Sequence, residues 1–242
     1  MLVRFFSLLG GFALFALLPL ACAKGPASGG PGSYHGVATG KDEIGILEVL
    51  VTEADQGPLP ATGTLKFPSK TLSLTGTLDK SQTLFSLAST DGYKLVALSR
   101  PAYAIGSYTS DTGEDAGSFA LLLVTADNPV DLYCGRIVDT SGEAPVSQPF
   151  AITATSGGQA VCVGHGFAYV GSLSSHHALD CAFGSAVFEG NVDFKSGNMW
   201  GTGTNYGTWS VTPCTSIEAS SDGGAPDASD DDAETDAVGA EE

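Results

Sequence analysis

Apolar and polar residues alternate at a period of two along many short stretches of this chain. Over 72–78 leucines alternate with serine and threonine, and over 186–194 alanine, phenylalanine and valine share one face. Successive side chains of a β-strand point to opposite faces, so this period indicates strands rather than helices. Many short strands separated by turns are typical of two architectures. The sequence therefore predicts an all-β protein, built as an antiparallel β-sandwich or barrel.

Turn residues divide the chain into strands of similar length. Glycine is abundant, with 32 residues, and pairs such as Asp91-Gly92 and Ser196-Gly197 stand between the alternating runs. Glycine and aspartate favour the backbone conformations of tight turns. The strands predicted in this way cover 44–52, 61–67, 71–78, 83–88, 93–98, 102–109, 117–125, 131–138, 148–155, 159–163, 166–173, 185–194, 198–203 and 207–212.

The second set of strands repeats the first at an offset of 95 residues. The matches are Gly76-Thr77-Leu78 with Gly171-Ser172-Leu173, Tyr93 with Phe188, Gly106 with Gly201 and, after a five-residue deletion, Gly117 with Gly207. Such internal similarity indicates a duplicated structural unit. We expect two tandem or pseudo-repeated β-meander halves, 41–128 and 129–214, as two small domains or as parts of one barrel. Pro129 marks the joint, because proline interrupts a ladder of hydrogen bonds.

The start of the chain is typical of an export signal. Arg4 precedes an apolar run of 16 residues, 5–20, and small residues follow it. We predict a secretory signal peptide over 1–21, because the run is shorter than the roughly 20 residues that span a bilayer. The residues Leu-Pro-Leu-Ala-Cys at 18–22 also resemble the lipobox of bacterial lipoproteins, which implies that Cys22 becomes the acylated first residue. Cleavage after Ala23 is the alternative.

The cysteine count fits an exported, disulfide-bonded body. Of five cysteines, four lie in the second half, and an even set suits two disulfides in an oxidising compartment. We expect Cys134 to pair with Cys214 and Cys162 with Cys181, although four cysteines allow three pairings. The fifth, Cys22, is the odd one, and lipidation would give it a role.

Zinc binding is an alternative use of the same thiols. Cys162, His165, His176, His177 and Cys181 contain the ligand types of a zinc cluster, and the first two have suitable spacing. An oxidising compartment favours the disulfide instead, with the histidines in exposed loops. We therefore expect no zinc and no other cofactor.

Two acidic segments are candidate calcium sites. The loop 110–115 holds three acids, of which Asp111 and Asp115 could bind calcium through their carboxylates. Asp230, Asp231 and Asp232 form a second acidic group, which lacks the alternating acids and turn glycine of a calcium loop. The simpler interpretations are a hairpin loop and a solvated tail.

The two ends of the chain differ in composition from its body. Residues 22–40 are rich in glycine and proline, which predicts a flexible, lipid-anchored tether. Residues 215–242 contain ten acids and no base, which predicts a disordered acidic tail. The formal net charge of −17 argues against nucleic acid as a partner, because phosphate binding needs clustered lysine and arginine.

No catalytic constellation stands out. The chain lacks the Gly-x-Ser-x-Gly motif, and Glu189 and Asp193 are expected on the wet face of one strand. Exposed aromatic residues are better candidates for binding, and we single out Trp200 and Tyr206. For Trp209 we expect a place in the core.

Strand ends of the form Gly-x-Tyr or Gly-x-Trp, with Tyr133-Cys134-Gly135 and the closing Cys214, resemble uncharacterised secreted β-rich lipoproteins of the myxobacterial type. The run Gly207-Thr208-Trp209 also resembles avidin-type barrels, which place such a strand beside a ligand cup. The first resemblance implies no known activity. We therefore expect an exported cell-envelope lipoprotein that acts as a non-enzymatic binding or structural surface module. Its partner would be membrane lipid through acylated Cys22.

The residue after Cys22 is alanine rather than aspartate, which in the resembling lipoproteins implies the outer membrane. A secreted or periplasmic location is the alternative. The competing functional hypothesis is a secreted hydrolase or a carbohydrate-active β-sandwich protein, which would place Glu189 near a second carboxylate.

Overall fold

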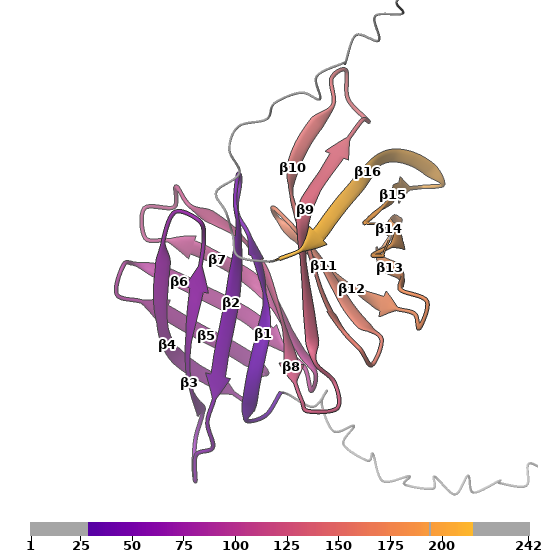
Figure 1. Ribbon diagram of the computed structural model, residues 1–242. Helices are drawn as coiled ribbons and strands as arrows, with labels where there is room; N and C mark the ends of the chain where they lie inside the picture. The colour runs from indigo at the N-terminus through magenta and orange to yellow at the C-terminus, as the bar shows by residue number, and fades with distance from the viewer. Residues whose placement is uncertain (1–28, 194, 215–242) are drawn as a thin grey trace, which may run out of the picture.

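The computed structural model describes residues 29–193 and 195–214, which form sixteen β-strands and no helix. The strands close into two barrels that follow one another along the chain (Figure 1). All neighbouring strands are antiparallel. The prediction of an all-β antiparallel fold in two tandem halves is therefore confirmed, as barrels. Within the described ranges, no helix is long and apolar enough to cross a membrane.

Each barrel is a meander closed by its first and last strands. The first consists of β1 (Gly32–Thr39), β2 (Ile44–Val51), β3 (Leu59–Lys66), β4 (Thr71–Asp79), β5 (Leu84–Ser89), β6 (Tyr93–Ser99), β7 (Tyr103–Ser110) and β8 (Ala116–Val124). The second consists of β9 (Val130–Asp139), β10 (Val146–Thr155), β11 (Gln159–Gly164), β12 (Phe167–Leu173), β13 (Ala178–Phe183), β14 (Ala186–Asn191), β15 (Ser196–Gly201) and β16 (Thr204–Pro213). The connection between the two barrels is 125–129, and its last residue is Pro129.

Two strands, β1 and β13, are missing from the sequence prediction. β1 occupies residues 32–39, which the sequence assigns to a flexible tether over 22–40. Its period-two pattern is hidden because both faces are buried: Tyr34 points into the first barrel, whereas Val37 packs against the second. The tether prediction is therefore wrong for 32–39. The predicted signal peptide, Cys22 and the acidic tail lie outside the described residues.

Side chains fill the interior of the first barrel. The alternating leucines of β4 point inward, as their pattern predicts. Tyr34 and Phe85 meet edge to face with ring centroids 5.7 Å apart, a geometry that aromatic pairs prefer. The largest fully buried side chains here are Tyr34, Leu47, Leu65, Phe67, Leu74, Leu78, Phe85, Leu95, Tyr108 and Phe119.

Aromatic rings dominate the interior of the second barrel. Phe150 stacks on Phe188 with ring centroids 5.3 Å apart and lies 6.0 Å from the ring of Trp209. Trp209 is 1% exposed, and its Nε1–H donates to the carbonyl oxygen of Glu189 at 3.1 Å. The polar group of this buried ring is thus satisfied, and the expected core position of Trp209 is confirmed.

Two disulfides link elements of the second barrel. Cys134 in β9 is bonded to Cys214, which follows β16, with Cα atoms 5.1 Å apart. Cys162 in β11 is bonded to Cys181 in β13, with Cα atoms 6.2 Å apart. These are the pairs expected from the sequence, and both separations lie in the usual range. Disulfides persist in oxidising environments, so they indicate a non-cytoplasmic compartment.

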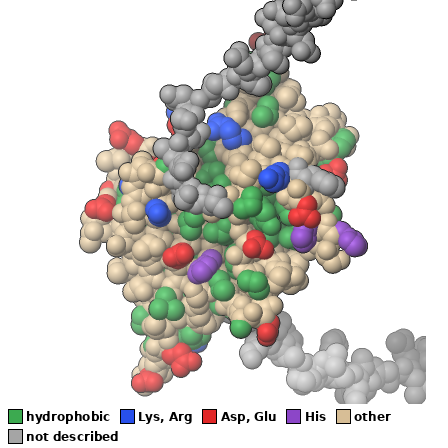
Figure 2. Space-filling view, viewed as in Figure 1, with side chains coloured by type: hydrophobic (Ala, Val, Ile, Leu, Met, Phe, Trp, Pro, Cys, Tyr) green, Lys and Arg blue, Asp and Glu red, His purple; other side chains and the backbone are tan. Residues whose placement is uncertain are grey.

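The strands β1, β8, β10 and β11 lie where the two barrels meet. An apolar cluster lies between the barrels, and Figure 2 shows hydrophobic side chains along this junction. Because both faces of these strands are buried, their sequences lose the alternation, as in the continuous run 119–124. The fully buried members of the cluster are Val37, Ala120, Leu122, Ala151, Val161 and Val163.

The two barrels share one strand register. Tyr34 of β1 lies opposite Val49 and Leu123, and Tyr133 of β9 lies opposite Ile152 and Pro213 in the same two neighbours. Carrying this correspondence through all pairings matches Gly36 with Gly135, Gly76 with Gly171, Gly106 with Gly197 and Gly117 with Gly207. At each of these positions a methyl group would collide with a carbonyl oxygen of the adjacent strand. The shared frame supports the expected duplication.

The register also corrects two matches made at a constant offset. Gly106 corresponds to Gly197 rather than Gly201, and Phe188 corresponds to Leu95 rather than Tyr93. The cause is a series of differences in hairpin length. Relative to this register, the connections β12–β13 and β13–β14 are each one residue shorter than β4–β5 and β5–β6, which accounts for Phe188. The connection β14–β15 is two residues shorter than β6–β7, which completes the shift at Gly197.

Candidate functional site

Four hairpin loops meet at one end of the first barrel. They are 40–43, 67–70, 90–92 and 111–115, which connect β1 to β2, β3 to β4, β5 to β6 and β7 to β8. In an antiparallel meander every second loop lies at the same end, so residues far apart in the sequence come together there. This polar end is the candidate functional site.

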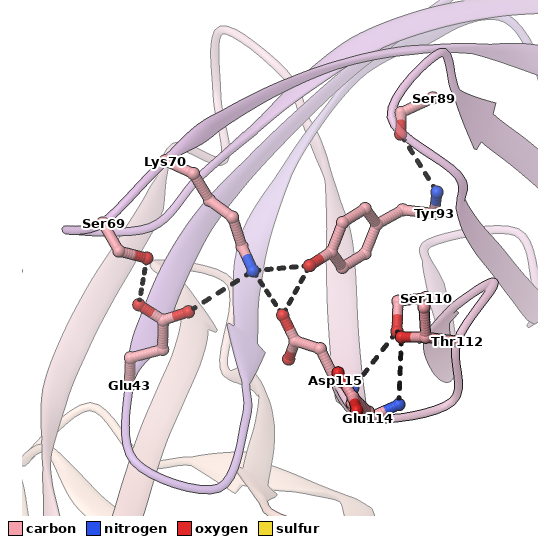
Figure 3. Close-up of polar contacts among 9 residues, drawn as sticks. All are labelled: Glu43, Ser69, Lys70, Ser89, Tyr93, Ser110, Thr112, Glu114 and Asp115. Carbon is pink, nitrogen blue, oxygen red and sulfur yellow. Dashed lines mark hydrogen bonds and ion pairs between the residues drawn. The ribbon is translucent and has the colours of Figure 1, made fainter.

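Lys70 lies at the centre of this end (Figure 3). Its ammonium group donates to the hydroxyl oxygen of Tyr93 at 2.6 Å and to a carboxylate oxygen of Asp115, and lies 4.0 Å from Glu43. The Tyr93 hydroxyl donates in turn to the same Asp115 oxygen at 2.6 Å. Ser69 donates to the other oxygen of Glu43 at 2.8 Å. The four loops are thereby tied together through one cation.

The network fixes the charges of its members. Partial burial acts to raise the pKa of Asp115, but the hydrogen bonds from Lys70 and Tyr93 outweigh it and lower that pKa. Burial acts to lower the pKa of Lys70, but Asp115 and Tyr93 outweigh it and raise the pKa. Burial and the neighbouring Asp115 raise the pKa of Tyr93. At neutral pH the site therefore contains an ammonium, a carboxylate and a neutral phenol.

Tyr108 lies beneath this network in the barrel interior. Its side chain is fully buried, and its hydroxyl has no hydrogen-bond partner among the described residues. Burial, followed by the charges of Asp115 and Glu43, raises the pKa of Tyr108. A methyl group on Gly40 would collide with this hydroxyl, so the loop above packs directly onto it. The charged layer thus closes the first barrel over an apolar interior.

An open cup of about 560 Å³ lies beside the network. The loop 110–115 is shaped by the hydroxyl of Ser110, which accepts from the backbone N–H of Asp115 at 3.2 Å. Lys94 binds Asp111 at 2.7 Å, and no ion pair to Asp91 or Glu114 is formed within the described part of the chain. The cup is lined by Thr90, Asp91, Gly92, Tyr93, Ser110, Asp111, Thr112, Glu114 and Asp115.

The cup does not assemble the calcium site predicted at Asp111 and Asp115. The two carboxylates are held by different lysines, Asp111 by Lys94 and Asp115 by Lys70. Across residues 29–193 and 195–214, no group of three His, Cys, Asp or Glu side chains could hold a metal ion. The sequence prediction is wrong here because it counted acids without the cations that neighbouring strands bring beside them. The second acidic group, 230–232, lies outside the described residues.

The alternative zinc cluster is not assembled, and its two cysteines form the disulfide expected from the sequence. Cys162 and Cys181 are buried and consumed by their disulfide. His176 and His177 lie in an exposed turn, where His177 Nδ1 is 2.7 Å from a carboxylate oxygen of Asp193. β14 ends at Asn191, so Asp193 lies in the following turn and not on a strand face with Glu189. The expected pair of carboxylates on one strand is therefore wrong.

The aromatic candidates for binding lie in different surroundings. Tyr206 packs against the core of the second barrel, where burial first, then Tyr169 and Asp139, raise its pKa. Trp200 follows the inward-pointing Met199 and is not part of that core. Its indole Nε1 is buried without a hydrogen-bond partner in the described chain. The structure does not bring these two aromatic residues together as one contact surface.

The residues of the network could not be found by sequence motif, because Glu43, Lys70 and Asp115 belong to three separate loops and Tyr93 is the first residue of β6. The available signal was positional, since each of these residues lies at or close to the end of a predicted strand. Comparison with known protein families, with curated proteins and with solved structures finds no match to the chain. Any functional assignment therefore depends on the geometry described above.

Proposed function

We propose that this protein is an exported, lipid-anchored module of the cell envelope. It acts without catalysis, and its first barrel binds a ligand in the cup beside Lys70.

 Two observations support export. The disulfides Cys134–Cys214 and Cys162–Cys181 belong to an oxidising compartment. The predicted signal peptide and Cys22 precede the described residues, and the lipobox-like segment before Cys22 supports an acyl anchor at that residue.

The cup is the observation that carries the binding proposal. Four carboxylates line it, and among the residues that the structure describes only Lys70 and Lys94 form ion pairs with them, which leaves Asp91 and Glu114 without an ion pair there. Hydroxyl groups of Thr90, Ser110 and Thr112 add neutral hydrogen-bonding groups. This combination favours a ligand that carries amines and hydroxyls, such as an amino sugar, and disfavours phosphates and carboxylates.

Binding without chemical conversion fits the ionisation of the site better than hydrolysis does. A glycosidase requires one carboxylic acid with a raised pKa to protonate the leaving group. In the network the pKa of Asp115 is lowered, which makes it a poor proton donor at neutral pH. Lys70 is held as a cation by Asp115, which makes it a poor nucleophile. We therefore favour the binding module over the carbohydrate-active enzyme.

Calorimetric titration of the purified full chain with glucosamine oligomers tests this proposal. We expect binding, weaker binding of the fully N-acetylated oligomers, and loss of binding in Asp91→Asn/Glu114→Gln. Asp180→Asn/Glu189→Gln is the matched control, since it removes two exposed carboxylates from the second barrel. Equal affinity in both double variants, or tighter binding of an acidic oligosaccharide, would contradict the proposal.

The anchor is tested separately by the intact mass of protein from the membrane fraction. We expect a chain that begins at Cys22 and carries acyl groups, with a gain of four protons when the two disulfides are reduced. A soluble chain that begins at Lys24 would refute the anchor and leave the binding proposal standing.

A further inference from the structure

An apolar groove runs along the outside of the first barrel, where the second barrel approaches it. Its volume is about 410 Å³. One wall comes from β5, β6 and β7 and includes Leu84, Val96, Leu98 and Ile105, and the other is the tip of the hairpin between β11 and β12, with Phe167. The groove therefore exists only because the two barrels pack side by side.

Two side chains of this groove are unusually open to solvent. Val96 is 47% exposed and Leu98 is 53% exposed, and both belong to β6. The other large hydrophobic side chains of comparable exposure, Leu50 and Val146, lie outside the groove. Apolar side chains gathered in a concave surface are typical of a site that an apolar partner covers.

The N-terminal end of the described chain lies next to the groove residues in β6. The backbone N–H of Gly29 donates to the hydroxyl of Ser99 at 3.1 Å, across 70 residues of sequence. Ser99 ends β6 and follows Leu98, but its side chain is buried on the opposite face of the strand. The chain that leads back to Cys22 therefore starts at the end of β6 where the apolar wall finishes, and has to pass around that end to reach the groove. Cys22 lies seven positions before Gly29, and this stretch can span up to roughly 25 Å when extended.

We infer that the groove holds an acyl chain carried by Cys22. This inference rests on the lipid anchor of the proposed function and adds a site for it. A fatty acyl chain is flexible and wholly apolar, which suits a mainly apolar groove whose polar side chains are the small hydroxyls of Ser107 and Ser118. Cys22 is joined to the first barrel by a short stretch of the same chain, so its acyl group is present at the groove at a high effective concentration.

Photo-crosslinking in the lipidated full chain tests the inference. In the variant Leu98→benzoylphenylalanine, the benzophenone ketone abstracts a hydrogen atom from a nearby C–H group on irradiation. The two resulting carbon radicals then combine to form a carbon–carbon bond. We expect a single-chain product in which the peptide containing position 98 is joined to the acylated N-terminal peptide. Leu50→benzoylphenylalanine, at a similarly exposed position outside the groove, is the matched control and should lack this product.

A second variant shows that the groove itself is required. Val96→Asp places a charge at an exposed position in the apolar wall, where the fold tolerates it, and should abolish the crosslink from position 98. A crosslink to a membrane phospholipid would overturn the inference in favour of membrane contact, and no crosslink in an acylated chain would also overturn it. Failure of the proposed anchor is recognised separately, from the mass of the N-terminal peptide. In that case the peptide either contains an unmodified Cys22 or begins after Cys22.

Discussion

In the first barrel Lys70 links four loops through ion pairs and hydrogen bonds, whereas in the second barrel disulfides link strands covalently. At the end of the second barrel that corresponds to the network, the rings of Phe167 and Tyr169 lie 4.8 Å apart and Tyr206 packs nearby. The register and the close-approach glycines are the same in both. The strand register of the barrel is thus independent of the interactions that link its loops and strands. Each barrel can therefore carry a different surface chemistry.

The largest difference between the barrels should appear on reduction. Loop-closure entropy assigns about 4.5 kcal/mol to Cys134–Cys214 and about 3.3 kcal/mol to Cys162–Cys181 as upper values. Both stabilise the second barrel, so reductant should lower its unfolding midpoint in urea and leave the first barrel almost unchanged. Both tryptophans, Trp200 and Trp209, belong to the second barrel, so tryptophan fluorescence follows that barrel alone.

Circular dichroism, which reports on both barrels, provides the comparison. With reductant it should show two transitions, of which only the earlier one coincides with the change in fluorescence. A single transition for both signals, shifted as a whole, would show that the junction couples the barrels too strongly for them to unfold separately.

Removing equivalent core rings should destabilise each barrel by a different amount. Phe119 and Trp209 occupy the same position in the shared register. Changing either to alanine leaves a cavity, which costs about 3–5 kcal/mol for a buried aromatic residue. Trp209→Ala should cost more, because it also removes the hydrogen bond to the carbonyl of Glu189.

Hydrogen exchange, resolved by peptide, is the measurement for this pair. Each variant should speed exchange mainly in its own barrel, with a larger effect for Trp209→Ala. Equal loss of protection in both barrels from either variant would contradict the separation of the two cores.

The strands could be predicted from the sequence wherever one of their faces is exposed to solvent. The leucines of β4 alternate with serine and threonine, and their inward orientation follows directly. β1 was missed because burial of both faces at the junction removes the alternation. The paired cysteines were identified because the oxidising compartment restricts their chemistry, although the choice among three pairings needed the fold.

The candidate site was far less accessible, for a physical reason. Asp111 and Asp115 attract attention as neighbouring acids, but their role depends on Lys94 and Lys70, which other strands and loops supply. A local pattern records which charges are adjacent along the chain. It does not record which opposite charges the closure of a barrel brings beside them.

The shared glycines make a smaller and symmetrical prediction. A side chain at Gly76 or Gly171 would collide with the carbonyl oxygen of Ser86 or Asp180 on the adjacent strand. Gly76→Ala and Gly171→Ala should therefore each cost about 1–3 kcal/mol, the usual cost of overpacking. Gly142→Ala is the control, because its nearest neighbouring atom, an oxygen of Ala144, would be 3.8 Å away. If urea denaturation shows no difference between these variants and the control, the close-approach glycines are not required for the register that the two barrels share.

The ion-pair network should give the smallest effect and confine it to the first barrel. Because the pKa of Asp115 is lowered from its ordinary value of 3.8, its contribution is present above pH 3.8 and is lost as the pH falls through the folded-state pKa. The pKa of Lys70 is raised from 10.5, so its contribution is present below that pH and is lost as the pH rises through the higher folded-state value.

Lys70→Met should therefore lower the stability of the first barrel by about 1 kcal/mol or less at neutral pH, as for a partly exposed ion pair. The difference between this variant and the unaltered chain should shrink as acid protonates Asp115, since the partner of Lys70 then loses its charge. Lys66→Met is the matched control, because Lys66 is exposed on β3 and forms no ion pair within the described chain. The effect is measured by denaturing both variants at neutral and at acidic pH, with hydrogen exchange in β4 as the signal for the first barrel. A Lys70 deficit that stays constant into acid would show that the lysine acts by packing against Phe67 and Tyr93 rather than by its charge.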